Sequence, residues 1–108
     1  MIAPQDCMTM AEVRAGVDET DRQLAALIAT RFAFMDAAAR IKPDRGAVRD
    51  EARKAAVIAN ARANAVAFGW PSEVAGALWE QLVEASIAYE FDTFDRIRTS
   101  AADSSAPR

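Results

Sequence analysis

The sequence contains no histidine and a single cysteine, Cys7. The absence of histidine excludes histidine-based acid–base catalysis, His-dependent catalytic triads and zinc sites built from Cys and His. One cysteine cannot form a disulfide within the chain, which suits a reducing cytoplasm. There is also no apolar run of about 18 residues, as a membrane-spanning helix requires, and no signal-peptide pattern at the N-terminus. We therefore expect a soluble, cytoplasmic protein without a metal or any other cofactor.

Glycine and proline are scarce, with 4 of each among 108 residues, whereas alanine is abundant. A chain that is 52% apolar and 27% charged can bury a core, and this composition predicts a single all-α domain. The net charge is -3 and the isoelectric point is about 4.9. We therefore expect neither nucleic acid nor an anionic membrane as a partner. Any anion site must come from a local group of Arg and Lys.

The stretch from Thr9 to Lys42 contains no proline and only one glycine, Gly16, and it follows an extended lead-in over 1–8. It opens with Thr9-x-x-Glu12, the capping-box pattern of a helix start, and ends where Pro43 cannot continue a helix. A helix of about 34 residues is roughly 50 Å long, which exceeds the diameter of a compact domain of this size. One chain cannot cover such a helix. We therefore expect an intertwined homodimer in which the long helices of two chains cross.

Two further helices are expected after this one. A loop over 43–48 leads to a helix from Arg49 to Phe68, and Gly69 stands where a left-handed residue ends a helix. After a turn, a third helix is expected over 73–98. The sequence therefore predicts a three-helix domain followed by a disordered tail, over 1–99 and 100–108 respectively.

Apolar residues recur along the first helix at spacings of three and four, which marks a buried face. The members of this apolar stripe are Met10, Val13, Val17, Leu24, Leu27, Ile28, Met35 and Ala38. Arg31 and Lys42 lie on the same face, where a cation is costly unless an anion meets it. One interpretation is that these two residues bind an anionic ligand. The other is structural: their side chains reach the rim of the core or pair with Asp and Glu of another helix.

The third helix repeats this pattern. Trp79, Val83, Ser86 and Glu90 step by four, three and four residues, so their side chains share one face. Glu90 either belongs to that buried face or lies beyond the core and faces water.

Charged residues also gather at the start of the second helix. Arg49 and Arg53 lie four residues apart on one face, and Asp50 precedes Arg53 by the spacing of an ion pair. For Arg49 we favour a solvated charged face. The inward candidates form a cationic set with one carboxyl group and no nucleophile, which suits binding of a small polyanion: Arg31, Lys42, Arg53, Ser86 and Glu90.

A further arginine, Arg14, lies about 25 Å before Arg31 along the helix axis. If it serves a site at all, it must serve the site of the other subunit.

This ordered set of residues resembles the all-α chorismate mutase family, whose three-helix chains intertwine as dimers with two shared active sites. The resemblance covers the chain from about Pro4 to Arg98. It rests on a set of charged and polar positions with defined spacing: Arg14, Arg31, Lys42, Val48-Arg49-Asp50 followed by Arg53, and Ser86-x-x-x-Glu90. Spaced arginines are common on helices, whereas the whole set in this order is fairly specific.

The resemblance implies a small dicarboxylate substrate, chorismate, and its pericyclic rearrangement to prephenate. Arg14 of the other subunit, Arg31 and Arg53 would bind the two carboxylates. Lys42 and Glu90 would donate to the ether oxygen of the C–O bond that breaks. Two more residues would contact the ring hydroxyl and line the pocket, respectively: Asp50 and Ser86. The reaction needs no nucleophile, because catalysis comes from positioning and from stabilising charge on the breaking bond.

Two positions depart from the family pattern. Position 90 is often Gln in bacterial members. Glu90 must be protonated to donate to an ether oxygen, so we expect activity to fall as pH rises.

Typical mutases also have Glu directly after the equivalent of Arg53, where this chain has Lys54. The related isochorismate-pyruvate lyases lack that Glu too, and the lead-in Pro4-x-Asp6-Cys7 resembles theirs. Lys54 carries little information if it points to solvent.

Three functions follow as alternatives. The first is chorismate mutase, and the second is isochorismate-pyruvate lyase, which makes salicylate and pyruvate from isochorismate. The third is a non-catalytic helical dimer, in which Arg31, Lys42 and Glu90 pair with one another or face solvent. An enzyme instead requires an enclosed basic pocket that Arg14 of the other subunit completes.

Overall fold

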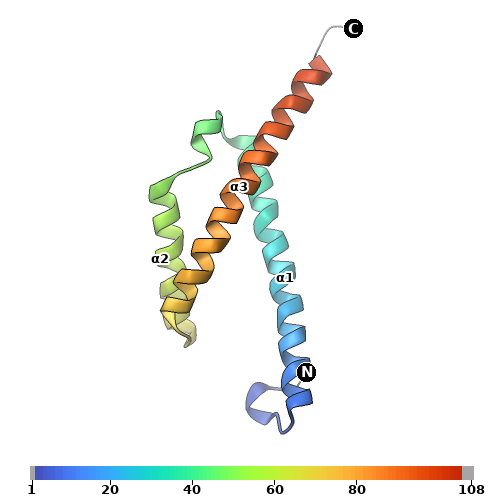
Figure 1. Ribbon diagram of the computed structural model, residues 1–108, viewed down its shortest axis with the longest axis vertical. Helices are drawn as coiled ribbons and strands as arrows, with labels where there is room; N and C mark the ends of the chain where they lie inside the picture. Colours follow the sequence, from blue (N-terminus) through green and yellow to red (C-terminus); the bar gives the residue numbers. More distant parts are fainter. Residues whose placement is uncertain (1, 106–108) are drawn as a thin grey trace. The chain divides into compact units, whose positions relative to one another are not determined.

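The computed structural model describes residues 2–105, and the side chains of residues 2–101, and in this part of the chain it contains three α-helices and no strand. The helices are α1 (Met10–Ile41), α2 (Glu51–Phe68) and α3 (Ser72–Ser105) (Figure 1). Two short 3-10 helices precede α1 and α2, namely η1 (Pro4–Asp6) and η2 (Arg45–Ala47). The all-α prediction is confirmed. None of the helices described is both long and apolar enough to cross a membrane.

α1 begins as the sequence predicts. The backbone N–H of Glu12 donates to Thr9 Oγ1 over 3.2 Å, and the Glu12 carboxylate accepts from the N–H of Met8, also over 3.2 Å. This arrangement is a variant of the capping box, in which the glutamate accepts from the residue before the N-cap, and it satisfies one unpaired N–H group of the first turn and one of the lead-in. At the other end the helix stops at Ile41, because Pro43 has no N–H to continue the ladder.

α2 begins at Glu51 rather than at Arg49, because Asp50 is its N-cap. The Asp50 side chain accepts a hydrogen bond from the N–H of Arg53 over 3.0 Å, as capping carboxylates do. The helix ends where it was predicted to end. Gly69 has φ 84°, a left-handed conformation that glycine adopts without a steric penalty.

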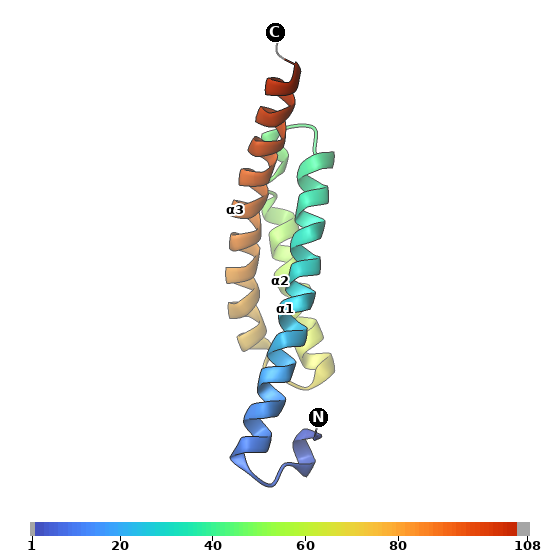
Figure 2. The same ribbon diagram turned by 90° about the vertical axis from the view of Figure 1, so that its right-hand side faces the viewer.

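α3 is longer than the predicted helix over 73–98. It runs alongside α2 in the opposite direction, as the two views of the ribbon agree (Figures 1 and 2). The helix continues to Ser105, into the stretch for which a disordered tail was predicted. Residues 106–108 of that tail lie outside the described residues.

The chain divides into two compact units, one ending at Phe34 and the other beginning at Met35, and each is described by itself. The second unit has a small apolar core at the end of α1. Its buried members are Ala39 of α1, Val48 after η2, and Phe94 of α3. Ile87 and Phe91 of α3 are half-buried and pack against these three residues. This core brings the end of α1 and the middle of α3 together, and it is where the candidate site lies.

The apolar stripe of α1 is mostly exposed in the single chain. Val17, Leu24 and Leu27 are 52%, 50% and 67% exposed. Only Met35 and Ala38, in the second unit, are half-buried. The face that the pattern predicts to be buried is therefore left exposed by the residues that the structure describes, as expected of a helix longer than its domain.

The lead-in is not extended as predicted, because it forms the 3-10 helix η1, after which Cys7 Sγ donates to Ala3 O over 3.6 Å. Between the lead-in and the first turns of α1 lies a mainly apolar pocket of about 310 Å³. It is lined by Ile2, Pro4, Cys7, Val13, Gly16, Val17, Thr20 and Asp21. None of the predicted site residues lines this pocket.

Candidate active site

Lys42 and Glu90 meet in the second unit, at the apolar core. Lys42 Nζ lies 2.6 Å from Glu90 Oε2 and also donates to the backbone carbonyl of Val48 over 3.4 Å. The two side chains are 29% and 5% exposed, respectively. Glu90 therefore belongs to the buried face of α3, and the alternative in which it faces water is wrong.

The position of this pair follows from the helices that carry it. Lys42 comes directly after α1, where Pro43 turns the chain, and Glu90 lies on the same face of α3 as the buried Val83. Charges in such a place are desolvated, so each depends on its partner. A lysine ammonium carries three N–H groups, and the contacts with Glu90 and Val48 use two of them. The third can donate to an oxygen atom of a ligand.

Ser86 lies one turn before Glu90 on α3 and is buried, with 3% exposure. Its hydroxyl donates to the carbonyl of Leu82 over 2.6 Å. Trp79 on the same face is half-buried. The predicted shared face of these residues is therefore confirmed, and Ser86 lies at its centre with its donor directed to the helix backbone.

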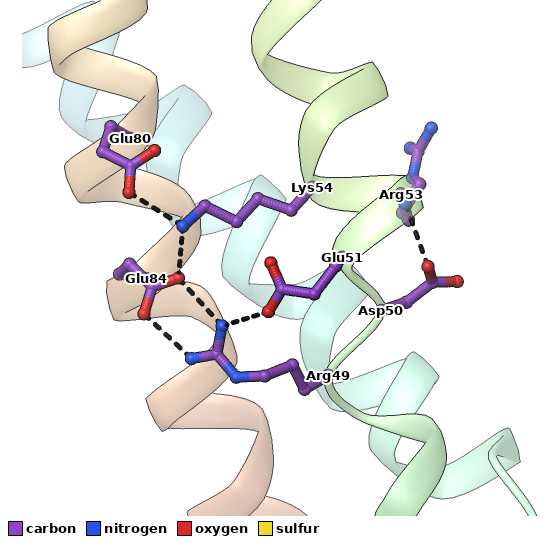
Figure 3. Close-up of polar contacts among 7 residues, drawn as sticks. All are labelled: Arg49, Asp50, Glu51, Arg53, Lys54, Glu80 and Glu84. Carbon is purple, nitrogen blue, oxygen red and sulfur yellow. Dashed lines mark hydrogen bonds and ion pairs between the residues drawn. The ribbon is translucent and has the colours of Figure 1, made fainter.

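Asp50 and Arg53 are neighbours at the start of α2. The Asp50 carboxylate bonds to the backbone N–H of Arg53, so the spacing predicted for an ion pair serves as a helix cap (Figure 3). The guanidinium of Arg53 is exposed and points away from the charged groups between α2 and α3 (Figure 3). It is therefore oriented outward, where an anion can reach it.

Five charged residues join the start of α2 to α3, and we call them the α2–α3 ion cluster: Arg49, Glu51, Lys54, Glu80 and Glu84 (Figure 3). Arg49 holds the Glu84 carboxylate with both terminal nitrogens, over 2.8 and 3.2 Å, and also bonds to Glu51 over 2.9 Å. Lys54 Nζ lies 2.8 Å from both Glu80 and Glu84.

The cluster bears on two points that the sequence raised. Arg49 is exposed, as expected of a solvated charged face, and it also bonds across to α3. Lys54 is not directed to solvent, because its side chain is 17% exposed and lies between two carboxylates. The signal that could have found this contact is the i,i+4 pair Glu80 and Glu84, a doubly acidic face opposite a basic helix start.

Hydrogen bonds within the cluster stabilise the charged forms of Glu84, Arg49 and Lys54. The hydrogen bonds from Arg49, and next those from Lys54, lower the pKa of Glu84 to about 2. Hydrogen bonds to Glu84 and Glu80 raise the pKa values of Arg49 and Lys54, respectively. Both cations are neutralised by their carboxylate partners, so neither is a good candidate for binding a carboxylate ligand.

A hydrogen bond beside Glu90 ties the end of α1 to α3. Tyr89 Oη donates to Asp36 Oδ1 over 2.7 Å, and this bond raises the pKa of Tyr89. Because the acceptor is a carboxylate, the bond is of the stronger, charge-assisted kind. The contact joins the last turns of α1 to α3 next to Glu90.

The structure thus brings some of the predicted site residues together and not others. Lys42 and Glu90 are in contact, with Ser86 one turn away, and Asp50 and Arg53 form the start of α2. The remaining two belong to the first unit, where they lie on α1: Arg14, which is exposed, and Arg31, which is half-buried.

Comparison with known proteins identifies one family. The family model described as chorismate mutase type II matches residues 13–91, which is more than half of the chain. All seven residues predicted for the site lie within this range. A search of curated protein sequences finds no match to the chain.

Proposed function

The chain belongs to the type II chorismate mutase family, and we propose that it rearranges chorismate to prephenate. The observation that carries this proposal is the buried contact of Lys42 Nζ with Glu90 Oε2, at 2.6 Å. The contact supplies a hydrogen-bond donor beside a carboxyl group in a largely desolvated place. Such a place strengthens any hydrogen bond to charge that develops on a reacting oxygen.

In the proposed mechanism, Lys42 donates to the ether oxygen of the C–O bond that breaks. Glu90, in its protonated form, donates to the same oxygen, and Ser86 lines the pocket beside it. Negative charge grows on this oxygen as the bond lengthens, so both donors bind the transition state more strongly than the ground state. No covalent intermediate is required, which suits a set of residues without a nucleophile.

The carboxylates of the substrate need cationic partners. Arg49 and Lys54 are held by Glu84 and its neighbours, whereas Arg53 is directed outward (Figure 3). We assign one carboxylate contact to Arg53, and the resemblance to the family adds two arginines of α1, Arg31 and the partner's Arg14. Asp50 would lie near the ring hydroxyl, with one of its oxygens used by the cap of α2.

A second copy of the chain completes the proposed site. The support for this is the uncovered apolar stripe of α1, with Leu24 and Leu27 half or more exposed, and the exposed position of Arg14. Pairing two such stripes removes apolar area from water, which stabilises a dimer. The homodimer is therefore part of the proposal.

Isochorismate-pyruvate lyase activity is the alternative, because Lys54 replaces the Glu that typical mutases have after Arg53. The contacts of Lys54 with Glu80 and Glu84 weaken this alternative, since a neutralised ammonium gives no direct discrimination between hydroxyl positions. The Pro4-x-Asp6-Cys7 lead-in, which resembles that of the lyases, still supports the alternative.

The experiment that tests the proposal supplies purified protein with chorismate and isochorismate separately and quantifies prephenate and salicylate. We expect prephenate in excess, and its loss in K42M. The matched control is R40M, which removes an exposed cation from the last turn of α1 and is expected to keep the activity. Salicylate in excess would assign the chain to the lyases. If neither product forms, the chain is a non-catalytic dimer, in which pairing of Lys42 with Glu90 is also expected.

A further inference from the structure

The end of α1 is held by a side chain of α3 that lies beyond the residues matched by the family model. Arg98 Nη1 donates to the carbonyl of Ala39 over 2.7 Å, and Nη2 donates to the carbonyl of Lys42 over 2.8 Å. The guanidinium carbon lies 3.5 Å from the centroid of the Phe94 ring. One half-buried side chain thus contacts two backbone carbonyls and an aromatic ring.

The end of a helix needs such a partner. The last four carbonyls of an α-helix have no N–H within the helix to bond to, and Pro43 offers none. Ala39 is fully buried, so its carbonyl would be costly to leave without a donor. The planar guanidinium can hold two carbonyls at once, and its positive charge is favourable at a helix C-terminus.

The residues of α3 that contact Lys42 form one stripe. Glu90, Phe94 and Arg98 are spaced by four, so their side chains lie above one another on the same face of the helix. Glu90 holds the ammonium of Lys42, and Arg98 holds its backbone carbonyl. Phe94 lies between them and packs in the apolar core. α3 therefore contacts both the ammonium group and the backbone carbonyl of Lys42.

We propose that Arg98 is a positioning residue for Lys42. A lysine carries its ammonium on a flexible stem of four carbons. The position of the ammonium is therefore well defined only if the backbone of the lysine is fixed. The Arg98 fork fixes that backbone at the end of α1, where helices otherwise fray. The inference rests on the proposed function, because the position of the Lys42 ammonium matters most if it donates to a reacting oxygen.

The kinetic test uses R98M, which keeps an apolar stem over Phe94 and removes the guanidinium. We expect kcat for chorismate to fall by about tenfold to a hundredfold, because small misplacements of a catalytic group have effects of this size. KM should change by less than about twofold, because Arg98 does not touch the substrate. R98K should recover part of kcat, since an ammonium can bond to one carbonyl but cannot span both.

The matched control is R96M. Arg96 lies on the same helix, is exposed, and donates to Thr93 Oγ1 over 3.3 Å. Its replacement changes the net charge of the chain as R98M does but leaves the end of α1 untouched. We expect R96M to keep the kcat of the wild type.

A spectroscopic readout separates this inference from the proposed function. The chain has only two lysines, Lys42 and Lys54. Labelling lysine with carbon-13 at Cε therefore gives two NMR signals, which K54R assigns. We expect R98M to shift the Lys42 signal and to leave the Lys54 signal in place, because Lys54 is held by Glu80 and Glu84. R96M should shift neither signal.

The outcomes are distinguishable. If the wild type does not convert chorismate, the proposed function fails, and a Lys42 signal that moves only in the Arg98 variants still supports the positioning role. If the wild type is active but R98M matches R96M in kcat or in the Lys42 signal, the inference is overturned and the proposed function stands. Should R98M fail to fold, R98K gives the same readouts and decides in the same way.

Discussion

Lys42 Nζ and Glu90 Oε2 lie 2.6 Å apart, with the carboxyl side chain only 5% exposed. The lysine comes from the end of α1, and the glutamate comes from the middle of α3. Their contact is therefore both a long-range link in the fold and the proposed catalytic centre. The two roles can be tested separately. The stability of the fold depends on the contact between Lys42 and Glu90, whereas catalysis depends on each of them as a hydrogen-bond donor.

The first prediction concerns stability. K42M leaves the Glu90 carboxyl buried without its partner, so we expect a loss of about 1.5–3 kcal/mol, the range for a hydrogen bond to a charged group. The double variant K42M/E90L should recover most of this loss, because an apolar pair leaves no buried polar group behind. Chemical denaturation at one protein concentration measures both. Equal stability of K42M and wild type would show that Glu90 does not depend on Lys42.

The second prediction concerns the pH dependence of catalysis. Only a protonated carboxyl group can donate to the ether oxygen, whereas the amide of E90Q donates at every pH. If Glu90 is such a donor, we expect activity to fall with rising pH in wild type and to stay flat in E90Q. The measurement is kcat/KM for chorismate at several pH values in both proteins. A falling limb that persists in E90Q would assign that limb to another group.

The third prediction concerns acid stability. Arg49 and Lys54 hold the pKa of Glu84 at about 2 in the folded chain, whereas an unfolded Glu has a pKa of about 4.3. A pKa lowered by folding stabilises the fold above the unfolded value, and the contribution is lost as pH falls toward the folded value. Wild type should therefore be more stable than E84Q near pH 7, and the difference should shrink between about pH 5 and about pH 2.

The control for this comparison is D92N, which removes an exposed carboxylate from the same helix. Denaturation midpoints at several pH values should show little difference between D92N and wild type. A stability difference between E84Q and wild type that stays constant with pH would contradict the assigned role of Glu84.

The fold was predictable largely because its helix boundaries are set by local chemistry. Thr9 and Glu12 form the cap that their spacing indicates, and Gly69 ends α2 in a left-handed conformation. The end of α3 was missed because the residues after Arg98 are small and polar but include no glycine or proline before Pro107. Ser, Thr and Asp are poor helix formers, yet they do not exclude a helix, and the alanines among them favour one.

The site was predictable only in part. Periodicity places Glu90 on the buried face of α3, because burial follows the helical repeat. It does not tell which residues of two helices meet. The bonds of Lys54 to Glu84 and of Arg98 to the carbonyl of Lys42 depend on how the helices are placed against one another, and sequence spacing within one helix carries no such information.

The fourth prediction concerns the dimer. L24D places a carboxylate in the middle of the apolar stripe of α1, and an unpaired charge buried at an interface costs about 3–5 kcal/mol. We expect this variant to be monomeric in sedimentation experiments at concentrations where wild type is a dimer. The control is A26D, because Ala26 lies about 200° around the helix from Leu24. Equal dimerisation of L24D and A26D would show that the stripe is not the interface.

The most direct test of the central claim, a mutase site completed by the partner's Arg14, mixes two inactive variants. R14A and K42A are unfolded together in equal amounts, refolded, and assayed with chorismate. In a mixed dimer one site keeps both residues, so random pairing should restore about a quarter of wild-type activity.

The control mixture is R31A with K42A, which leaves every site lacking one residue if both residues serve the same subunit's site. The account predicts recovery in the first mixture and none in the second. Activity in the first mixture no higher than that of the separate variants would contradict a site shared between two copies.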